Sequence, residues 1–184
     1  QYRAQFISMV IMIALGVGIF LGFNMEWVSI ETNTDYFYEA AGFADYRIIS
    51  ESGFSREELD QIAGTAGVDA ASRYISVTAD VREREGDSLA LSVTENAEVS
   101  GVLVTEGAAY DAKSADGIWL SDKYAAANGI SVGDTLTLAY QNLELCGTVR
   151  GLAKACEHMI CVRDETQLMP DYDTFGFAYI SPVF

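Results

Sequence analysis

The sequence predicts an α+β protein, in which an N-terminal transmembrane helix and a stalk lead into a mixed α/β domain. Two observations predict this class. Residues 6–23 (FISMVIMIALGVGIFLGF) contain no charged side chain and only Ser8 as a polar one. The remainder of the 184-residue chain alternates short β-prone runs with brief helical patterns.

The apolar run of residues 6–23 is best explained as a membrane span. At 1.5 Å per residue it covers roughly 27 Å, close to the ~30 Å hydrocarbon core of a bilayer. A cleaved signal peptide has a shorter apolar core and a small-residue cleavage site, and a buried core helix is seldom apolar on every side. We therefore predict a transmembrane helix over residues 1–28, with membrane lipid around residues 6–23.

Charges on the two sides of the span predict its orientation. Arg3 precedes the span, whereas Glu26, Glu31 and Asp35 follow it, and basic residues favour the cytoplasmic side. The N-terminus is therefore expected in the cytoplasm, and the residues after about 28 are expected outside the cell membrane. Because the chain does not begin with Met, we expect it to be part of a longer protein.

The helix is expected to continue outward as a stalk over residues 29–44, since no Gly or Pro interrupts the chain between Asn24 and Gly42. An extracytoplasmic domain then occupies residues 45–184. Its first run, DYRIIS at residues 45–50, predicts a short strand.

A helix and a hairpin are predicted next. Ser55 and Glu58 form a capping-box pattern, in which each side chain satisfies a backbone donor of the other residue, and this predicts a helix to about Ala63. The alternating run at residues 67–84 and the run SLALSVTE at 88–95 predict two strands joined by a turn. Together with the strand before the helix, this gives the domain a β-α-β start.

The second half of the domain is predicted to be rich in short strands, with one short helix. Ser121 is the expected N-cap of this helix, which stops at Asn128 and Gly129. Strands are predicted at residues 98–107, 117–120, 135–140, 143–152, 158–163 and 175–181, and a helical turn at residues 164–170.

Acidic side chains dominate the domain. The chain has 11 Lys and Arg against 27 Asp and Glu, and Arg3 is the only charged residue before Asn24. Such a surface argues against binding to nucleic acid or to anionic lipid headgroups, which require clustered basic side chains. It can attract cationic substrates such as basic peptides, although an acidic, well-solvated surface accounts for the same composition.

No catalytic, cofactor-binding or metal site is predicted, and the chain is not expected to be an enzyme. His158 is the only histidine, so a nucleophilic relay would have to use it, and we expect a structural role instead. Cys146 is a third thiol beside Cys156 and Cys161; the latter two either form a disulfide or stay buried free thiols. The CEHMIC run lacks the C-x-x-C spacing of a zinc site.

In the order and spacing of these patterns, the chain resembles the permease subunits of MacB/FtsX-type ABC transporters. The resemblance covers the first membrane helix with its stalk, ADYRIIS, and FSREELDQIAGTAGVDAASR. Its most specific part is GVLVTEGAAYDAKSADGIWLSDKYAAANGISVGDTLTLAYQNLELCGTVRGLA, residues 101–153. The final VRDETQLMPDYDTFGFAYIS resembles the part of the domain that returns toward the membrane in that family.

The resemblance implies a MacB-like extracytoplasmic core domain, in which a smaller β-rich subdomain, here at about residues 86–150, is inserted into a mixed α/β subdomain. It also implies a dimer of permease subunits and a separate cytoplasmic ATPase that binds the ATP. ATP-driven motion would then cross the membrane and shape an export or extraction path for a peptide, lipid or protein substrate. The alternative is a single-pass membrane sensor with an extracellular ligand-binding domain. A second alternative is a membrane-anchored enzyme that uses His158.

Overall fold

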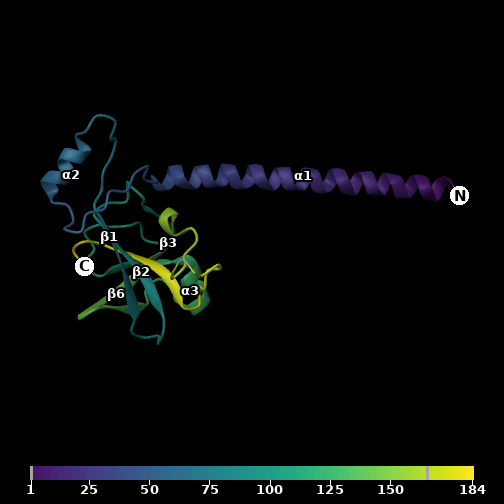
Figure 1. The fold of residues 1–184 in the computed structure, drawn as a ribbon. Helices are drawn as coiled ribbons and strands as arrows, with labels where there is room; N and C mark the ends of the chain where they lie inside the picture. Colours follow the sequence, from purple (N-terminus) through teal and green to yellow (C-terminus); the bar gives the residue numbers. More distant parts are fainter. Residues whose placement is uncertain (1, 165) are drawn as a thin grey trace. The chain divides into compact units, whose positions relative to one another are not determined.

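The computed structural model describes residues 2–164 and 166–184, and it has the predicted α+β architecture with an N-terminal helix (Figure 1). The chain divides into two units, Gln1–Glu39 and Ala40–Phe184. The first unit holds most of the long helix, and the second holds all the strands that the described residues form.

Helix α1 (Tyr2–Ala41) is one uninterrupted helix that contains the predicted span and most of the predicted stalk. Its 40 residues correspond to a length of about 60 Å. Its most apolar window has a mean hydropathy of 2.6, and none of that window is buried. By length and composition α1 can therefore cross a membrane, while the boundary at residue 28 stays a prediction.

The second unit is built around one mixed sheet. Within the described residues this sheet has seven strands in the order β3-β6-β4-β7-β2-β1-β5, and β6 pairs with β5 as well. The extra pairing closes six of the strands into a ring and leaves only β3 outside it. The pairs β2–β7 and β4–β6 are parallel, and the other pairs are antiparallel. The strands are β1 (Tyr74–Val81), β2 (Ser88–Thr94), β3 (Val102–Gly107), β4 (Gly117–Ser121), β5 (Thr135–Tyr140), β6 (Leu143–Ala155) and β7 (Phe175–Ile180).

Two apolar clusters pack against the sheet, and β4 contributes to both. Successive side chains of a strand point to opposite faces. Ile118 and Leu120 accordingly join one cluster, whereas Trp119 joins the other. The first cluster also contains Leu89, Leu91, Leu138 and Val149, and the second contains Phe175, Phe177 and Tyr179.

The two short helices begin as the sequence predicts. At α2 (Arg56–Ala63), the Glu58 N–H donates to the Ser55 hydroxyl at 3.2 Å, and the Ser55 N–H donates to the Glu58 carboxylate at 2.7 Å. These bonds lower the pKa of Glu58. At α3 (Asp122–Asn128), Ser121 is the N-cap, and the helix ends at Gly129 with a φ of 65°. The capping box and both ends of α3 are therefore confirmed.

Two predicted strands are wrong. Residues 45–50 form neither a helix nor a strand, so the predicted β-α-β start is absent. Residues 158–163 form no strand either, because the chain leaves β6 at Ala155 and enters a single 3₁₀ turn, η1 (Cys156–His158). Both runs are β-prone, but no neighbouring strand pairs with them, and a strand is stable only when a partner completes its hydrogen bonds.

The predicted helical turn at residues 164–170 is wrong, whereas the predicted β-rich subdomain stays a prediction. The described part of residues 164–170 contains turns and bends and no helix, which corrects the predicted helical turn; Glu165 lies outside the described residues. The strands that begin between residues 86 and 150 lie in the same sheet as β1 and β7. A separate β-rich subdomain at about 86–150 stays a prediction, as do the other proposed domain boundaries.

We predict that a buried hydrogen bond between α3 and the start of β2 is important for stability. The Tyr124 hydroxyl donates to the Asp87 carboxylate at 2.7 Å, and both residues are buried. Tyr124→Phe removes this donor from a buried carboxylate, so the free energy of unfolding should fall by about 1–3 kcal/mol. Urea unfolding of the chain in detergent, followed by tryptophan fluorescence in a Trp27→Phe background that leaves Trp119 as the emitting residue, measures this change. Tyr46→Phe is the control, because Tyr46 is 90% exposed; equal stability of the two variants would contradict the prediction.

Candidate functional site at the end of the long helix

The end of α1 and the turn after it are hydrogen-bonded to the loop before β3. Ala41 is the only buried residue of α1, with an exposed fraction of 3%. Its carbonyl accepts the Gly101 N–H at 2.8 Å, and the Gly42 carbonyl accepts the Ser100 N–H at 2.7 Å. The Ala44 N–H donates to the Ser100 hydroxyl at 3.2 Å. We call these five residues the helix junction; all of them belong to the second unit.

Two glycines allow the backbones of the helix junction to approach closely. Gly42 has a φ of 59°, and a Cβ on it would lie 2.0 Å from the carbonyl oxygen of Glu98. A Cβ on Gly101 would lie 2.1 Å from the carbonyl oxygen of Ala97. Backbone atoms cannot rotate out of the way as a side chain can, so glycine is the residue that fits at both positions.

Ser100 lies at the centre of the helix junction, and its own backbone adopts a sparsely populated conformation. Its φ is 47°, which is unusual for a residue other than glycine. It is buried, and its hydroxyl and its N–H both bond to the turn after α1. Such a backbone conformation costs of order 1–3 kcal/mol, so the surrounding contacts must hold it in place.

A second set of contacts lies at η1. Glu157 forms an ion pair with Arg47, and the Arg47 guanidinium lies 5.2 Å from the centroid of the Tyr74 ring. The Glu157 side chain is only 15% exposed, so the pair is partly shielded from water. Arg47 therefore joins the segment after the helix junction to the end of β6 and to the start of β1.

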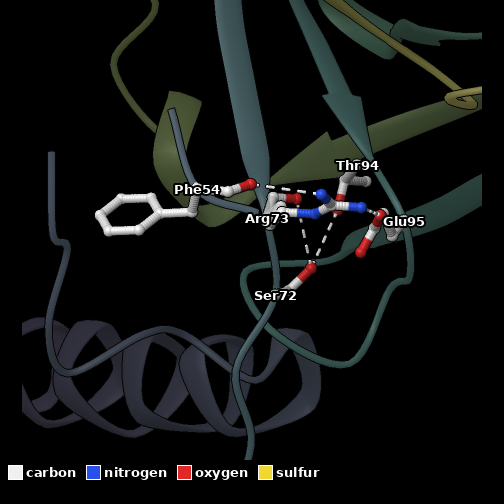
Figure 2. Close-up of polar contacts among 5 residues, drawn as sticks. All are labelled: Phe54, Ser72, Arg73, Thr94 and Glu95. Carbon is white, nitrogen blue, oxygen red and sulfur yellow. Dashed lines mark hydrogen bonds and ion pairs between the residues drawn. The ribbon is translucent and has the colours of Figure 1, made fainter. Parts of the chain in front are cut away.

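Arg73, the residue before β1, contacts two further segments, as Figure 2 shows. Its guanidinium donates to the Phe54 carbonyl at 3.3 Å and pairs with the Glu95 carboxylate. The hydrogen bond from Arg73 is the main cause that lowers the pKa of Glu95. The Ser72 and Thr94 hydroxyls lie 3.5 Å apart in the same place. The chain that leads away from the helix junction is thus fixed to the start of β1 and the end of β2.

His158 packs as an aromatic ring. It stacks on Phe177 with a centroid distance of 5.0 Å and meets Tyr179 edge-on at 6.2 Å. Its Nε2 has no hydrogen-bond partner in the part of the chain that the structure describes. Burial lowers the pKa of His158 to about 4; Glu157 opposes this shift and Arg47 adds to it. The ring is therefore neutral at pH 7, and the expected structural role agrees with these contacts.

All three cysteines are free thiols, so the alternative of a disulfide between Cys156 and Cys161 is wrong. Those two residues are buried, and Cys146 is exposed. Burial is the main cause that raises the pKa of Cys156, while a hydrogen bond with Ser100 acts in the opposite direction. Burial raises the pKa of Cys161 to about 11. Both buried thiols are protonated at neutral pH and are poor nucleophiles.

The described residues bring no metal-binding group together. Across 2–164 and 166–184, no cluster of three His, Cys, Asp or Glu side chains has the arrangement needed to hold an ion. The sequence patterns do not identify the helix junction, because Gly42 indicates only where the uninterrupted stalk helix ends. The remaining signal is the Ser100-Gly101 pair before β3, because such pairs often adopt unusual backbone conformations.

Comparisons with known proteins find similarity in structure but no match in sequence. No protein-family model matches the sequence, and no curated protein matches it. The chain is similar to the crystal structure of the extracellular domain of the noncanonic ABC-type transporter YknZ from Gram-positive bacteria. The sequence identity is 14% and the TM-score 0.49, with 72% of this chain and 64% of that chain covered. This chain thus spans less than two thirds of that domain, and a similarity of this level assigns neither a family nor a function.

We predict that Gly42→Ala weakens the helix junction far more than the matched variant Gly53→Ala. Both glycines have positive φ, 59° and 73°, but a Cβ on Gly53 meets nothing within 4 Å. The backbone conformation alone should cost about 1–2 kcal/mol at Gly53. The added clash with Glu98 should bring the cost at Gly42 to about 2–5 kcal/mol. Urea unfolding of both variants in detergent measures the difference, and equal losses would show that Gly42 is not constrained by the contact.

We also predict that His158 makes stability depend on pH. Unfolded histidine gains a proton below its ordinary pKa of 6.5, whereas folded His158 stays neutral down to about 4. The free energy of unfolding should therefore fall as the pH drops through this window, by about 2 kcal/mol between pH 7 and pH 5. His158→Phe removes the only histidine, so urea unfolding should show no such slope in that variant. A wild-type slope that the variant retains would contradict the prediction.

Proposed function

We propose that the chain is the extracytoplasmic core domain, with the first transmembrane helix, of a MacB/FtsX-type ABC transporter permease. In this proposal it transmits ATP-driven motion across the membrane and shapes an export or extraction path. The proposal rests on the order and spacing of the sequence patterns. The structural observation that supports it is the helix junction, where one uninterrupted apolar-to-polar helix ends in backbone hydrogen bonds to the sheet domain.

The helix junction suits mechanical transmission because its contacts are mainly between backbone atoms, which are less flexible than side chains. A long helix resists bending, since its backbone groups are paired along its length. At its end, the bonds of Ala41 and Gly42 are made by carbonyls and amides, which have no side-chain rotamers to absorb movement. The contacts of Gly42 with Glu98 leave no space between the two backbones. A shift of the last turn of α1 would therefore be passed to the loop before β3.

The partners follow from the same proposal. A separate cytoplasmic ATPase would bind the ATP, two permease subunits would form a dimer, and the residues after about 28 would lie outside the cell membrane. The substrate would be a peptide, a lipid or a protein. The excess of 27 acidic over 11 basic side chains favours a cationic substrate.

The gene context tests the class of protein directly. We expect the reading frame beyond Phe184 to encode three further apolar spans, and a neighbouring gene to encode an ATPase with a P-loop. A cytoplasmic signalling domain encoded before the span, with no further spans beyond Phe184, would instead favour the single-pass sensor and would contradict the permease.

We predict that, with two glycines inserted after Thr32, ATP hydrolysis no longer moves the extracytoplasmic domain. Glycine lowers helix stability, so the insertion should create a flexible point in α1. Exposed Cys146 can carry a spin label, while buried Cys156 and Cys161 stay unlabelled. In the full-length dimer with its ATPase, ATP should change the distance between the two Cys146 labels, and the insertion should abolish most of this change while ATP hydrolysis continues.

The control for the insertion keeps the length of the helix. Replacing Thr32 and Asn33 together with alanine should preserve the ATP-dependent distance change, because alanine favours the helix. An unchanged response in the glycine variant, with ATP hydrolysis also unchanged, would show that α1 does not transmit the motion.

A further inference from the structure

Strand β1 has one side that is only partly paired. On one side it pairs with β2 from Tyr74 to Asp80. On the other side it pairs with β5 at Asp80 and Val81 alone, because β5 ends at Tyr140 and the chain turns into β6. Within residues 2–164 and 166–184, no strand pairs with this side of β1 before Asp80. We call the unpaired side of Tyr74–Thr78 the open edge.

The hydrogen bonds further along the chain show which backbone groups point to the open edge. The Val81 N–H donates to the Asp87 carbonyl, toward β2, and the Arg82 N–H donates to the Thr137 carbonyl, toward β5. The N–H and C=O groups of successive residues in an antiparallel strand alternate between its two sides. The N–H and C=O groups of the even-numbered residues Tyr74, Ser76 and Thr78 therefore point to the open edge.

The other edge of the sheet is protected, whereas the open edge is not. Natural edge strands avoid unwanted pairing through bulges, charged residues and prolines. β3 has an irregularity between Val104 and Glu106, and Glu106 adds an exposed charge. The open edge has the sequence YISVT, an unbroken register with β2 and no charge or proline. Its Ile75 side chain is 61% exposed.

We propose that the open edge binds an extended cationic peptide segment, which adds to the sheet as a further strand beside β1. Backbone groups of Tyr74, Ser76 and Thr78 supply the hydrogen bonds, as in other cases of strand addition. Ile75 lies on the face of β1 that carries Val77 toward the first apolar cluster, so the added strand places apolar side chains on that face and polar ones on the other.

The charge of the domain favours a cationic peptide over a second copy of this chain as the strand that binds the open edge. Residues 24–184 carry 10 basic and 27 acidic side chains. A second copy of this chain would bring the same negative charge to the edge, whereas a lysine-bearing segment is attracted to it. Because the open edge needs only the folded domain, this proposal does not depend on the proposed role in transport.

The test uses the whole chain in a neutral detergent and a labelled probe peptide, Lys-Val-Lys-Val-Lys-Val-Lys with blocked ends. Ser76→Pro removes one N–H from the open edge and leaves the pairing with β2 intact; prolines are tolerated in edge strands at such positions. Ser76→Ala is the matched control, because it keeps the N–H. By fluorescence anisotropy, the wild type and Ser76→Ala should bind equally, and Ser76→Pro should bind roughly tenfold more weakly or worse.

Two further peptides keep the result clear even if Ser76→Pro fails to fold. A peptide with glutamate in place of lysine, and one with N-methylated lysines and valines, should each bind the wild type roughly tenfold more weakly or worse. Absence of binding to the lysine peptide, or equal binding of the N-methylated peptide, would overturn the proposal. Equal binding of the glutamate peptide would overturn the role of charge. Self-association of the peptide-free chain that Ser76→Pro abolishes would identify a second copy as the occupant and overturn the cationic partner.

Discussion

The rest of the second unit depends on the pairing of β6 with three different strands. β6 pairs with β5 at its start, with β4 in its middle and with β3 at its end. This requires close approaches at Gly147 and Gly151, where a Cβ would lie 2.5 Å from the Phe184 ring and 2.8 Å from the Trp119 ring. Glycine at both positions lets β6 close the ring of strands without displacing either aromatic side chain.

β6 also determines where the helix junction is supported. The strand ends at Ala155 and passes directly into η1, which places Glu157 beside Arg47 and His158 on Phe177. The ion pair is half-exposed on its Arg47 side, and such pairs contribute little to stability. The backbone hydrogen bonds around Ser100 therefore contribute more to the stability of the helix junction than the ion pair does. The ion pair and the ring stack determine the orientation of the segments around Ser100.

Local signals in the sequence were enough to predict the elements whose boundaries are set by nearby residues. The capping box at Ser55, the stop at Gly129 and the hairpin of β5 and β6 are of this kind. Residues 45–50 carry an equally clear β pattern, yet they form no strand, because pairing depends on a neighbour that the local sequence does not specify. The parallel pairs and the helix junction join residues far apart in the chain, for example Ala41 and Gly101. Periodicity within one segment carries no information about such contacts.

Tyr74 connects the two regions for which a function is proposed. It is the first residue of the open edge, and its ring lies against the Arg47 guanidinium, three residues after Ala44 of the helix junction. A movement of the chain after α1 would therefore change the surroundings of the open edge at its first hydrogen-bonding residue. Coupling of this kind is reciprocal: if motion of α1 alters the affinity of the open edge for a peptide, binding of the peptide must bias the position of α1 by the same free energy. The affinity of the open edge for the peptide, measured with and without the glycine insertion after Thr32, therefore tests this coupling from the side of the open edge. The ATP-driven distance measurement tests the same coupling from the side of α1.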